Sequence, residues 1–443
     1  QYWKWHQPPQ GDPVEVLEDP PIRISKALLS LAASRKLKSL KAVVSAPTLR
    51  PDGTVMDTLG FDEETGLLFE TEQNIVAVPT NPTPEEVKTA TRTLLKPFNE
   101  FPVVGPGGWG VIVSALLTAV VRPALPTSPA FGFDAPIQAS GKTLLASCVG
   151  ALATGEAPTI WPHTAGRDDE EVRKRLFTAL RNGTRALVWD NVVGQFDSAA
   201  MAAALTAPNM TDRVLGKSES ISIPNRSIML MTGNNLTLAG DMPRRVLKCR
   251  IDPQTDRPFA REFKLDPLSY VIEHRQEMAA AALTIVRGWL TSGAKRAPGR
   301  MASFENWDDF VRQPVAWLGR DIFPGGFADP MEAVTAAQAS DPEQESLHEM
   351  LLAWQGIYGT SYVTASAVHS TINGGYGDDR RKTSRLKEAL VELNNGRDIA
   401  SAKGLGRILS YRRARIVGGL QLKVKLDKSS NAKMWCVAGK ADE

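Results

Sequence analysis

A short run near the middle of the chain, Ser140-Gly141-Lys142-Thr143, constrains its fold more than any other feature. It follows the apolar stretch Pro129–Phe133 and precedes Leu144–Val149, which has helical character. A strand, a Gly-Lys-Thr turn and a helix are the layout of a phosphate-binding loop (P-loop). Backbone N–H groups and the helix N-terminus surround a polyphosphate, the lysine neutralises its charge, and the threonine hydroxyl ligates Mg²⁺. The run therefore predicts a site for ATP and Mg²⁺ in an α/β fold.

The run departs from the usual P-loop pattern at one position, because Pro136 stands where a glycine is expected. Gly-Lys-Thr alone is a weak signal, and a surface turn that begins a helix is the alternative interpretation. The candidate nucleotide-binding residues are Pro136, Ile137, Gln138, Ala139, Ser140, Gly141, Lys142 and Thr143.

A second apolar run, Ala186–Trp189, ends in the carboxylate of Asp190. Such a run predicts a buried parallel strand, and a carboxylate at its C-terminal end lies beside a P-loop, where it can hold Mg²⁺. An ordinary strand-end aspartate is the alternative. The next residue in many ATPases is an acid that orients the attacking water, but here it is Asn191, which cannot act as a base. Asp197 is a possible substitute.

A third apolar run, Ser227–Met231, leads into Thr232-Gly233-Asn234-Asn235. If this strand lies between the other two, Asn234 can contact the γ-phosphate or the attacking water; otherwise the segment is a turn. Arg244 and Arg245 follow nine residues later, and a guanidinium suits transition-state phosphate charge, including that of a neighbouring subunit. A solvated basic pair is the alternative for these arginines.

The order of these segments and their residues resemble the motifs of the superfamily 3 helicases, which are AAA+-related ring ATPases of phages, plasmids and DNA viruses. The resemblance covers roughly residues 125 to 262, about a third of the chain. It is carried most clearly by Met210–Lys217, Ile223-Pro224-Asn225, Thr232–Asn235 and Gly240–Val246, and Ala135-Pro136 resembles the P-loop preface of prophage ATPases. Ala139 and Asn191 depart from the stricter patterns.

The resemblance implies a role for each matching residue. Lys142 and Thr143 would bind phosphate and Mg²⁺, Asp190 would hold the metal, and Asn234 would sense the γ-phosphate. Arg244 and Arg245 would reach the site of the adjacent subunit in a ring that is expected to be a hexamer. The segment from Arg213 to Pro224 would form a hairpin in the ring pore, with Arg213 or Lys217 touching DNA; an exposed hairpin with ordinary charges is the alternative.

The C-terminal end of the chain is strongly basic. From Arg380 to Lys440 the only acids are Glu388, Glu392, Asp398 and Asp427, a balance that favours a nucleic-acid partner over a merely solvated surface. The pattern predicts helices at 346–357, 365–372 and 380–393, then strands at 407–416, 420–426 and 433–437. Three helices and a short sheet are typical of a winged helix, whose third helix would enter a groove. A lid or oligomerisation domain is the alternative.

The sequence thus predicts an α/β protein: a P-loop, AAA+-like ATPase core with a parallel sheet, a small N-terminal α+β region, and a C-terminal winged-helix-like domain. The expected divisions are 1–80, extended and β; 81–125, helical; 126–295, ATPase; 296–343, helical linker; and 344–443, DNA-binding. The most apolar stretch, Val111–Val121, is too short for a membrane span and is expected to be a buried helix.

The expected function is a ring-forming, ATP-dependent DNA helicase or translocase for phage or mobile-element replication, acting on single-stranded or forked DNA. Two alternatives remain open: a nucleotide-assembled DNA-binding initiator or scaffold with little hydrolysis, and an ATPase that acts on protein partners. Cys148, Cys249 and Cys436 show no metal spacing, which fits the cytoplasm of a bacterial or phage-infected cell. Because the chain begins at Gln1, an upstream primase domain or a primase partner is also expected.

Overall fold

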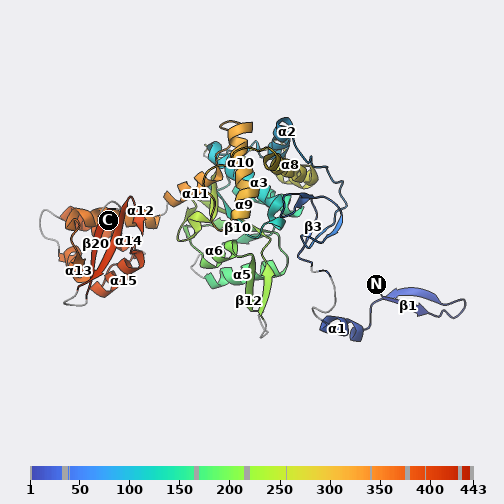
Figure 1. Cartoon of the computed structure of the whole chain (residues 1–443), viewed down its shortest axis with the longest axis horizontal. Helices are drawn as coiled ribbons and strands as arrows, with labels where there is room; N and C mark the ends of the chain where they lie inside the picture. Colours follow the sequence, from blue (N-terminus) through green and yellow to red (C-terminus); the bar gives the residue numbers. More distant parts are fainter. Residues whose placement is uncertain are drawn as a thin grey trace.

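The computed structural model describes residues 2–31, 38, 40–163, 169–213, 220–255, 257–339, 342–374, 380–394, 396–427 and 432–439. Three parts follow one another along the long axis in Figure 1: an N-terminal arm, a central α/β body and a C-terminal domain. The body and the C-terminal domain each have their own buried apolar cluster.

A five-stranded parallel sheet forms the centre of the body. Its order is β16-β8-β14-β10-β9, with bounds Val246–Arg250, Ala130–Ala135, Ile228–Asn234, Ala186–Val192 and Ile160–Pro162. β8 is buried along its whole length, as expected for a parallel strand covered on both faces. The predicted placement of the third apolar run between the other two is confirmed, because β14 pairs with both β8 and β10. The carboxyl ends of β8, β14 and β10 therefore meet at one edge.

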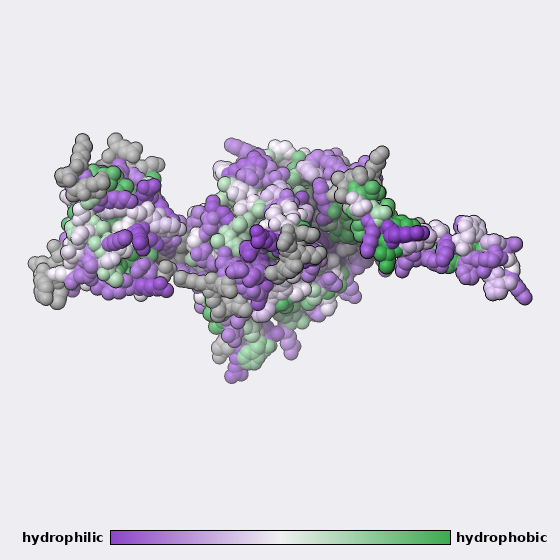
Figure 2. Space-filling model, turned by 90° about the horizontal axis from the view of Figure 1, so that it is seen from below, coloured by the Kyte–Doolittle hydropathy of each residue, from purple (hydrophilic) through white to green (hydrophobic). Residues whose placement is uncertain are grey.

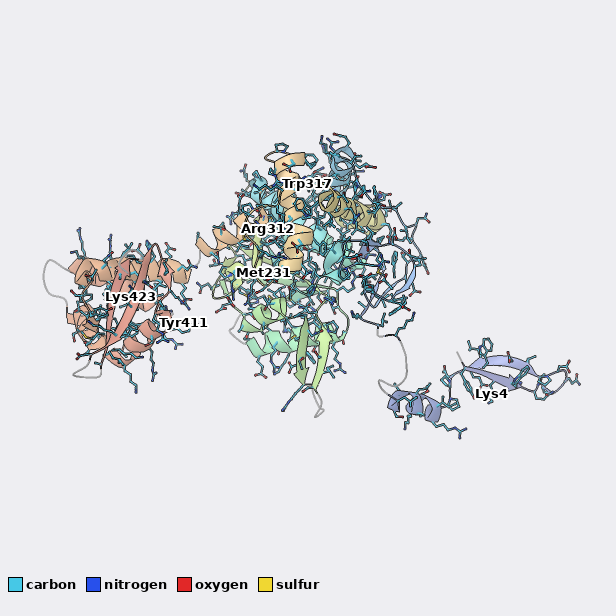
Figure 3. All side chains as sticks on the ribbon, in the orientation of Figure 1. Lys4, Met231, Arg312, Trp317, Tyr411 and Lys423 are labelled. Carbon is cyan, nitrogen blue, oxygen red and sulfur yellow. The ribbon has the colours of Figure 1, made fainter. Side chains whose placement is uncertain are left out.

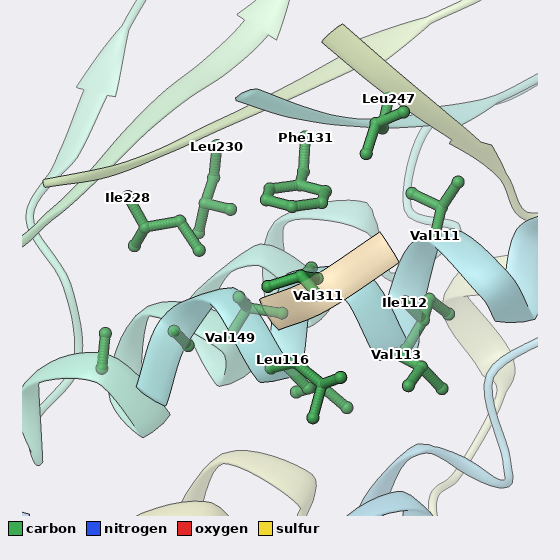
Figure 4. Close-up of a cluster of buried hydrophobic side chains, with 14 of the residues drawn as sticks. Val111, Ile112, Val113, Leu116, Phe131, Val149, Ile228, Leu230, Leu247 and Val311 are labelled. Atoms are coloured by element: carbon green, nitrogen blue, oxygen red, sulfur yellow. The ribbon is translucent and has the colours of Figure 1, made fainter. Parts of the chain in front are cut away.

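Two apolar helices, α3 (Gly105–Val121) and α4 (Lys142–Thr154), cover one face of the sheet. Figure 4 shows Val111 and Leu116 of α3 and Val149 of α4 in the same cluster as Phe131 and Leu230 of the strands. Among the described residues one helix, Gly105–Ala124, is long and apolar enough to cross a membrane, but 83% of its most apolar window is buried inside the fold. The expected buried helix at Val111–Val121 is thus confirmed.

Further helices complete the body. α2 (Pro84–Leu95) packs on α8 (Arg275–Thr291). Thr83 is its N-cap, as the sequence predicts, and forms a capping box with Glu86. The region expected to be a linker contributes buried side chains to the same core, including Trp307 and Trp317. Its elements are α9 (Glu305–Trp307), η6 (Asp308–Arg312), α10 (Gln313–Trp317), η7 (Leu318–Ile322) and α11 (Pro330–Ala339).

On the other side of the body, α5 (Asp169–Arg181) packs on α6 (Ala199–Thr206), next to an antiparallel hairpin. The hairpin strands are β12 (Asn209–Arg213) and β13 (Ser220–Pro224), and they project from the body in Figure 1. Lys217 lies outside the described residues. α7 (Pro267–Glu273) packs on α4, and the short strands β11 (Gln195–Phe196) and β15 (Thr237–Leu238) pair in parallel.

The N-terminal residues form a hairpin, β1 (Tyr2–His6) with β2 (Val14–Glu18), and a helix, α1 (Ile22–Ser30), rather than a wholly extended segment. Apolar side chains of α1 are exposed, and green surface gathers near this part of the chain in Figure 2. The expected small β unit follows, as β3 (Ala42–Val44), β7 (Leu67–Phe69) and β6 (Gly60–Asp62), beside the pair β4 (Thr48–Leu49) and β5 (Val55–Met56).

In the C-terminal domain, helices pack on a four-stranded sheet of order β17-β20-β19-β18. The helices are α12 (Pro342–Tyr358), α13 (Ala365–Gly374), α14 (Arg380–Glu392) and α15 (Ala402–Arg412). The strands are β17 (Val363–Thr364), β18 (Ile416–Val417), β19 (Leu420–Leu426) and β20 (Lys433–Gly439). The predicted strand at 407–416 is wrong, because Leu405 and Leu409 recur at helical spacing and are buried, and Ser401 caps the helix.

Candidate nucleotide-binding site

The loop between β8 and α4, residues 136–141, lies at the carboxyl edge of the sheet. Ala139 and Gly141 have φ of 57° and 95°, the left-handed region that favours glycine. A Cβ at Gly141 would also lie 3.4 Å from Cε1 of Phe101, so glycine suits this position best. The Ser140 hydroxyl donates to the Ile137 carbonyl at 2.6 Å and tightens the loop.

The Lys142 amine lies inside this loop. Its Nζ donates to the Ile137 carbonyl at 3.0 Å and to Oδ1 of Asn234, at the end of β14, at 2.7 Å. Burial lowers the pKa of Lys142, and the carboxylates of Asp134 and Asp190 act in the opposite direction. The lysine is therefore held at the sheet edge by neutral acceptors, with two carboxylates near enough to favour its charged form.

Asp190, at the end of β10, accepts two hydroxyl hydrogen bonds on the same oxygen. Thr143 Oγ1 and Thr232 Oγ1 each donate to Asp190 Oδ1 at 2.7 Å. Thr232 in turn accepts from the backbone N of Asn191 at 3.0 Å, and Asn191 has a φ of 58°. Thr232 thus holds both the carboxylate and the irregular backbone of β10 that follows it, a positioning role that sequence reasoning missed.

An ion pair between the buried carboxylate of Asp134 and the partly exposed Arg250 lies at the same edge, and sequence reasoning missed it. The Asp134 side chain is 1% exposed; it accepts from Leu236 N at 2.7 Å and from Arg250 Nη1 at 2.6 Å. Arg250 ends β16, and its guanidinium is within 3.5 Å of Asn235 Oδ1. The pairing of β16 with β8 places it there, and no motif marks it in the sequence.

Arg244 and Arg245, the two arginines predicted to reach a neighbouring subunit, lie at the opposite edge of the sheet. The Ala130 amide, at the start of β8, donates to the Arg245 carbonyl at 2.9 Å, whereas Lys142 follows the end of β8. A six-residue strand spans roughly 17 Å at about 3.3 Å per residue. Neither Arg244 nor Arg245 therefore joins the network around Lys142 of its own chain.

Both arginines pair with Asp241. Arg244 donates to its carboxylate at 2.5 and 2.9 Å, which raises the pKa of Arg244, and its side chain is half exposed. Arg245 is mostly buried; it pairs with Asp241 at 2.7 Å and donates to the Ala202 carbonyl. Arg244 is thus the arginine whose side chain has more freedom to reach outward.

The remaining predicted residues lie elsewhere. Arg213, at the end of β12, is exposed beside a groove of about 480 Å³ between α5 and the hairpin, which is lined by Arg173, Lys174 and Arg181 among others. Arg173 forms an ion pair with Asp212 there. Asp197 lies against Gly240, where a Cβ would come within 2.4 Å of its Oδ1; its role as a base stays a prediction.

No protein-family model matches the chain, and no curated protein matches it. Among solved structures, the chain is similar to the A form apo structure of the NrS-1 C-terminal region, residues 305–718. The identity is 11%, the TM-score 0.38, and the match covers 88% of this chain and 84% of that one. A second A form apo structure of the same region gives 12% identity, a TM-score of 0.37, and coverage of 97% and 92%. Scores of this size do not establish a common fold.

Proposed function

We propose that this chain is an Mg²⁺-dependent ATPase that assembles into a ring and translocates along DNA, as a helicase in phage or mobile-element replication. One observation carries the proposal: Lys142, Thr143, Asp190 and Asn234 come from three segments far apart in the sequence and lie in adjacent hydrogen-bonded groups at one sheet edge. Ligands of open α/β sheets bind at this edge.

The residues present fit Mg²⁺ and a nucleoside triphosphate. Among the described residues no three His, Cys, Asp or Glu side chains gather into a metal site. Mg²⁺ in ATPases needs no such cage, since it is usually held by one or two carboxylates together with waters and substrate phosphates. The oxygens of Thr143 and Asp190 would supply the protein side of that shell, and bound Mg²⁺ would neutralise phosphate charge.

Lys142 and Asn234 would contact the phosphates directly. The amine donates to the Ile137 carbonyl and to the Asn234 amide oxygen, and both acceptors are neutral. Anionic phosphate oxygens would accept stronger hydrogen bonds from the amine and could therefore replace them. The N-terminus of α4 supplies further backbone donors. Binding would then require the Ile137 carbonyl to turn away from the amine.

The position of the arginine segment is the reason for proposing a ring. Because Arg244 and Arg245 lie a strand length away from Lys142 in the same chain, a phosphate-contacting arginine from this segment would act in an adjacent copy. We assign this role to the half-exposed Arg244. The projecting hairpin, with Arg213 at its described end, would face DNA in the pore.

The test is phosphate release with and without single-stranded DNA, comparing the wild type with Lys142→Ala. Turnover that DNA stimulates and that Lys142→Ala abolishes is the expected result. Turnover that is indifferent to DNA would favour an ATPase that acts on protein partners. Lys142→Ala with undiminished turnover would refute the assignment of the site.

Asn191 favours a second candidate, a nucleotide-assembled DNA-binding initiator or scaffold. It occupies the position after Asp190 where many ATPases carry an acid; it is exposed, and its backbone has a left-handed φ that asparagine tolerates well. Such a protein would assemble with ATP yet release no phosphate. Sedimentation with ATP, measured beside phosphate release, separates the two candidates.

A further inference from the structure

The helix α15 carries an exposed stripe of cationic and aromatic side chains. Lys403, Arg407 and Tyr411 recur every fourth residue, so they lie on one face of the helix, and all three are exposed. The opposite face is buried through Leu405 and Leu409. We call Lys403, Arg407 and Tyr411 the α15 stripe; Figure 3 labels Tyr411 on the surface of the C-terminal domain.

The surroundings of the stripe are also cationic and open. α15 contains no acidic residue. Gly404 lies beside the stripe. Apart from the backbone of its own helix, a Cβ added to Gly404 would meet only the Oγ of Ser401, at 3.5 Å. A ligand can therefore approach the helix closely at this point. The Arg415 guanidinium lies 5.0 Å from the centre of the Tyr411 ring and also pairs with Glu343 of α12 at 3.1 Å. Tyr411 itself is 70% exposed.

The preceding helix α14, predicted from the sequence to enter a groove, is a weaker candidate. Leu386 and Leu390 are buried and the helix packs on α12. Its exposed face mixes Arg381 and Arg385 with Glu388, beside a hollow of about 600 Å³. Lys387 is within 3.7 Å of the Asp398 carboxylate. The cationic character of α14 is therefore partly offset by Glu388 on its exposed face, whereas the acid beside α15, Glu343 of α12, pairs with Arg412 and Arg415, which lie outside the stripe.

We infer that the α15 stripe is a binding site for double-stranded DNA, separate from the projecting hairpin. An α-helix about 10–12 Å across fits the major groove, which is about 12 Å wide. Lys403 and Arg407, one turn apart, would contact phosphates, and Tyr411 would contact sugar or a base edge.

The test is fluorescence anisotropy of a labelled duplex of about two helical turns with the full chain, without nucleotide. The test variant is Lys403→Glu with Arg407→Glu. The matched control is Arg381→Glu with Arg385→Glu on α14, which changes the charge equally. Circular dichroism and thermal unfolding establish that both variants fold.

We expect the α15 variant to bind duplex at least ten times more weakly, and its salt slope to fall by about two, because two phosphate contacts are lost. The α14 control retains most of the affinity. An α15 variant that binds like the wild type, an equal loss in the α14 control, or wild-type binding to single strands alone would each overturn the inference. Because no nucleotide is present, failure of ATP hydrolysis leaves this result unaffected.

Discussion

The sharpest test of the candidate site is Thr232→Val, which removes one hydroxyl and nearly preserves side-chain shape. Thr232 Oγ1 donates to Asp190 Oδ1 at 2.7 Å and accepts from Asn191 N at 3.0 Å, and the residue is 1% exposed. Valine can do neither. The carboxylate loses a donor, and a backbone N–H beside it loses its acceptor.

The size of the effect follows from these two bonds. A hydrogen bond to a charged group contributes about 1.5–3 kcal/mol, and an unsatisfied buried donor costs about 1–3 kcal/mol. Since Asp190 is half-buried and Asn191 is exposed, the lower ends of both ranges apply, and the free energy of unfolding falls by about 2.5 kcal/mol. For a unit the size of the body this lowers Tm by roughly 5–10 °C.

Turnover should fall as well, because Asp190 would no longer be held in one orientation beside Thr143. Loss of the carboxylate bond alone, about 1.5–3 kcal/mol, corresponds to roughly 10–100-fold in rate. The assay is Mg²⁺-dependent phosphate release, titrated with Mg²⁺, beside a thermal unfolding curve. A loss of turnover that rising Mg²⁺ partly restores would indicate a positioning role rather than general unfolding.

Two controls make the prediction refutable. Thr232→Ser keeps the hydroxyl and loses one buried methyl, worth about 1 kcal/mol, so it should retain most of the turnover. Thr284→Val removes a buried hydroxyl that donates to the Ala280 carbonyl at 2.8 Å in α8, far along the chain from the site, and should leave turnover unchanged. If Thr232→Val kept both its Tm and its turnover, the assignment of Thr232 would be wrong.

Three further predictions concern the charged residues at the two edges of the sheet. Arg245→Ala should lower the free energy of unfolding by about 1.5–3 kcal/mol, measured by denaturation, because it removes the ion pair with Asp241 and the hydrogen bond to the Ala202 carbonyl. Arg244→Ala should leave Tm unchanged but abolish turnover, and mixing it with Lys142→Ala subunits should restore part of that turnover; no restoration would count against an intersubunit arginine. Arg250→Met should lower the free energy of unfolding by about 1–3 kcal/mol, because the buried Asp134 carboxylate would lose a hydrogen bond from a partly exposed cation, and an undisturbed denaturation curve would contradict this.

The sequence was sufficient to predict the centre of the sheet and the residues at its edge. Apolar runs that end in Asp190 and Asn234 have the length and composition of buried parallel strands, and the central position assumed for the third run matches β14, which lies between β10 and β8. Lys142, Thr143, Asp190 and Asn234 then had to lie near one another, since parallel strands share an edge. Their hydrogen bonds confirm that proximity.

Other features could not be predicted because they depend on tertiary pairing. β16 alternates apolar and basic residues, and only its pairing with β8 places Arg250 beside Asp134. The role of Thr232 likewise depends on the pairing of β14 with β10, which brings the Asp190 carboxylate within hydrogen-bond distance of its hydroxyl. In the C-terminal domain a strand was predicted where α15 forms, because the arginines after Ile408 interrupt the apolar pattern. The structure shows that Leu405 and Leu409, four residues apart, are the buried positions of a helix.

The two edges of the sheet together explain why assembly and catalysis would be linked in the proposed ATPase. The carboxyl edge holds the lysine, the hydroxyl and the carboxylate, but the arginine segment precedes β16 and is anchored at the amino edge through Asp241 and Ala202. A rotation of the Arg244 side chain cannot cover roughly 17 Å of strand. A single copy would therefore bind nucleotide without its arginine, and hydrolysis would begin only when a second copy brings its amino edge to the first copy's loop.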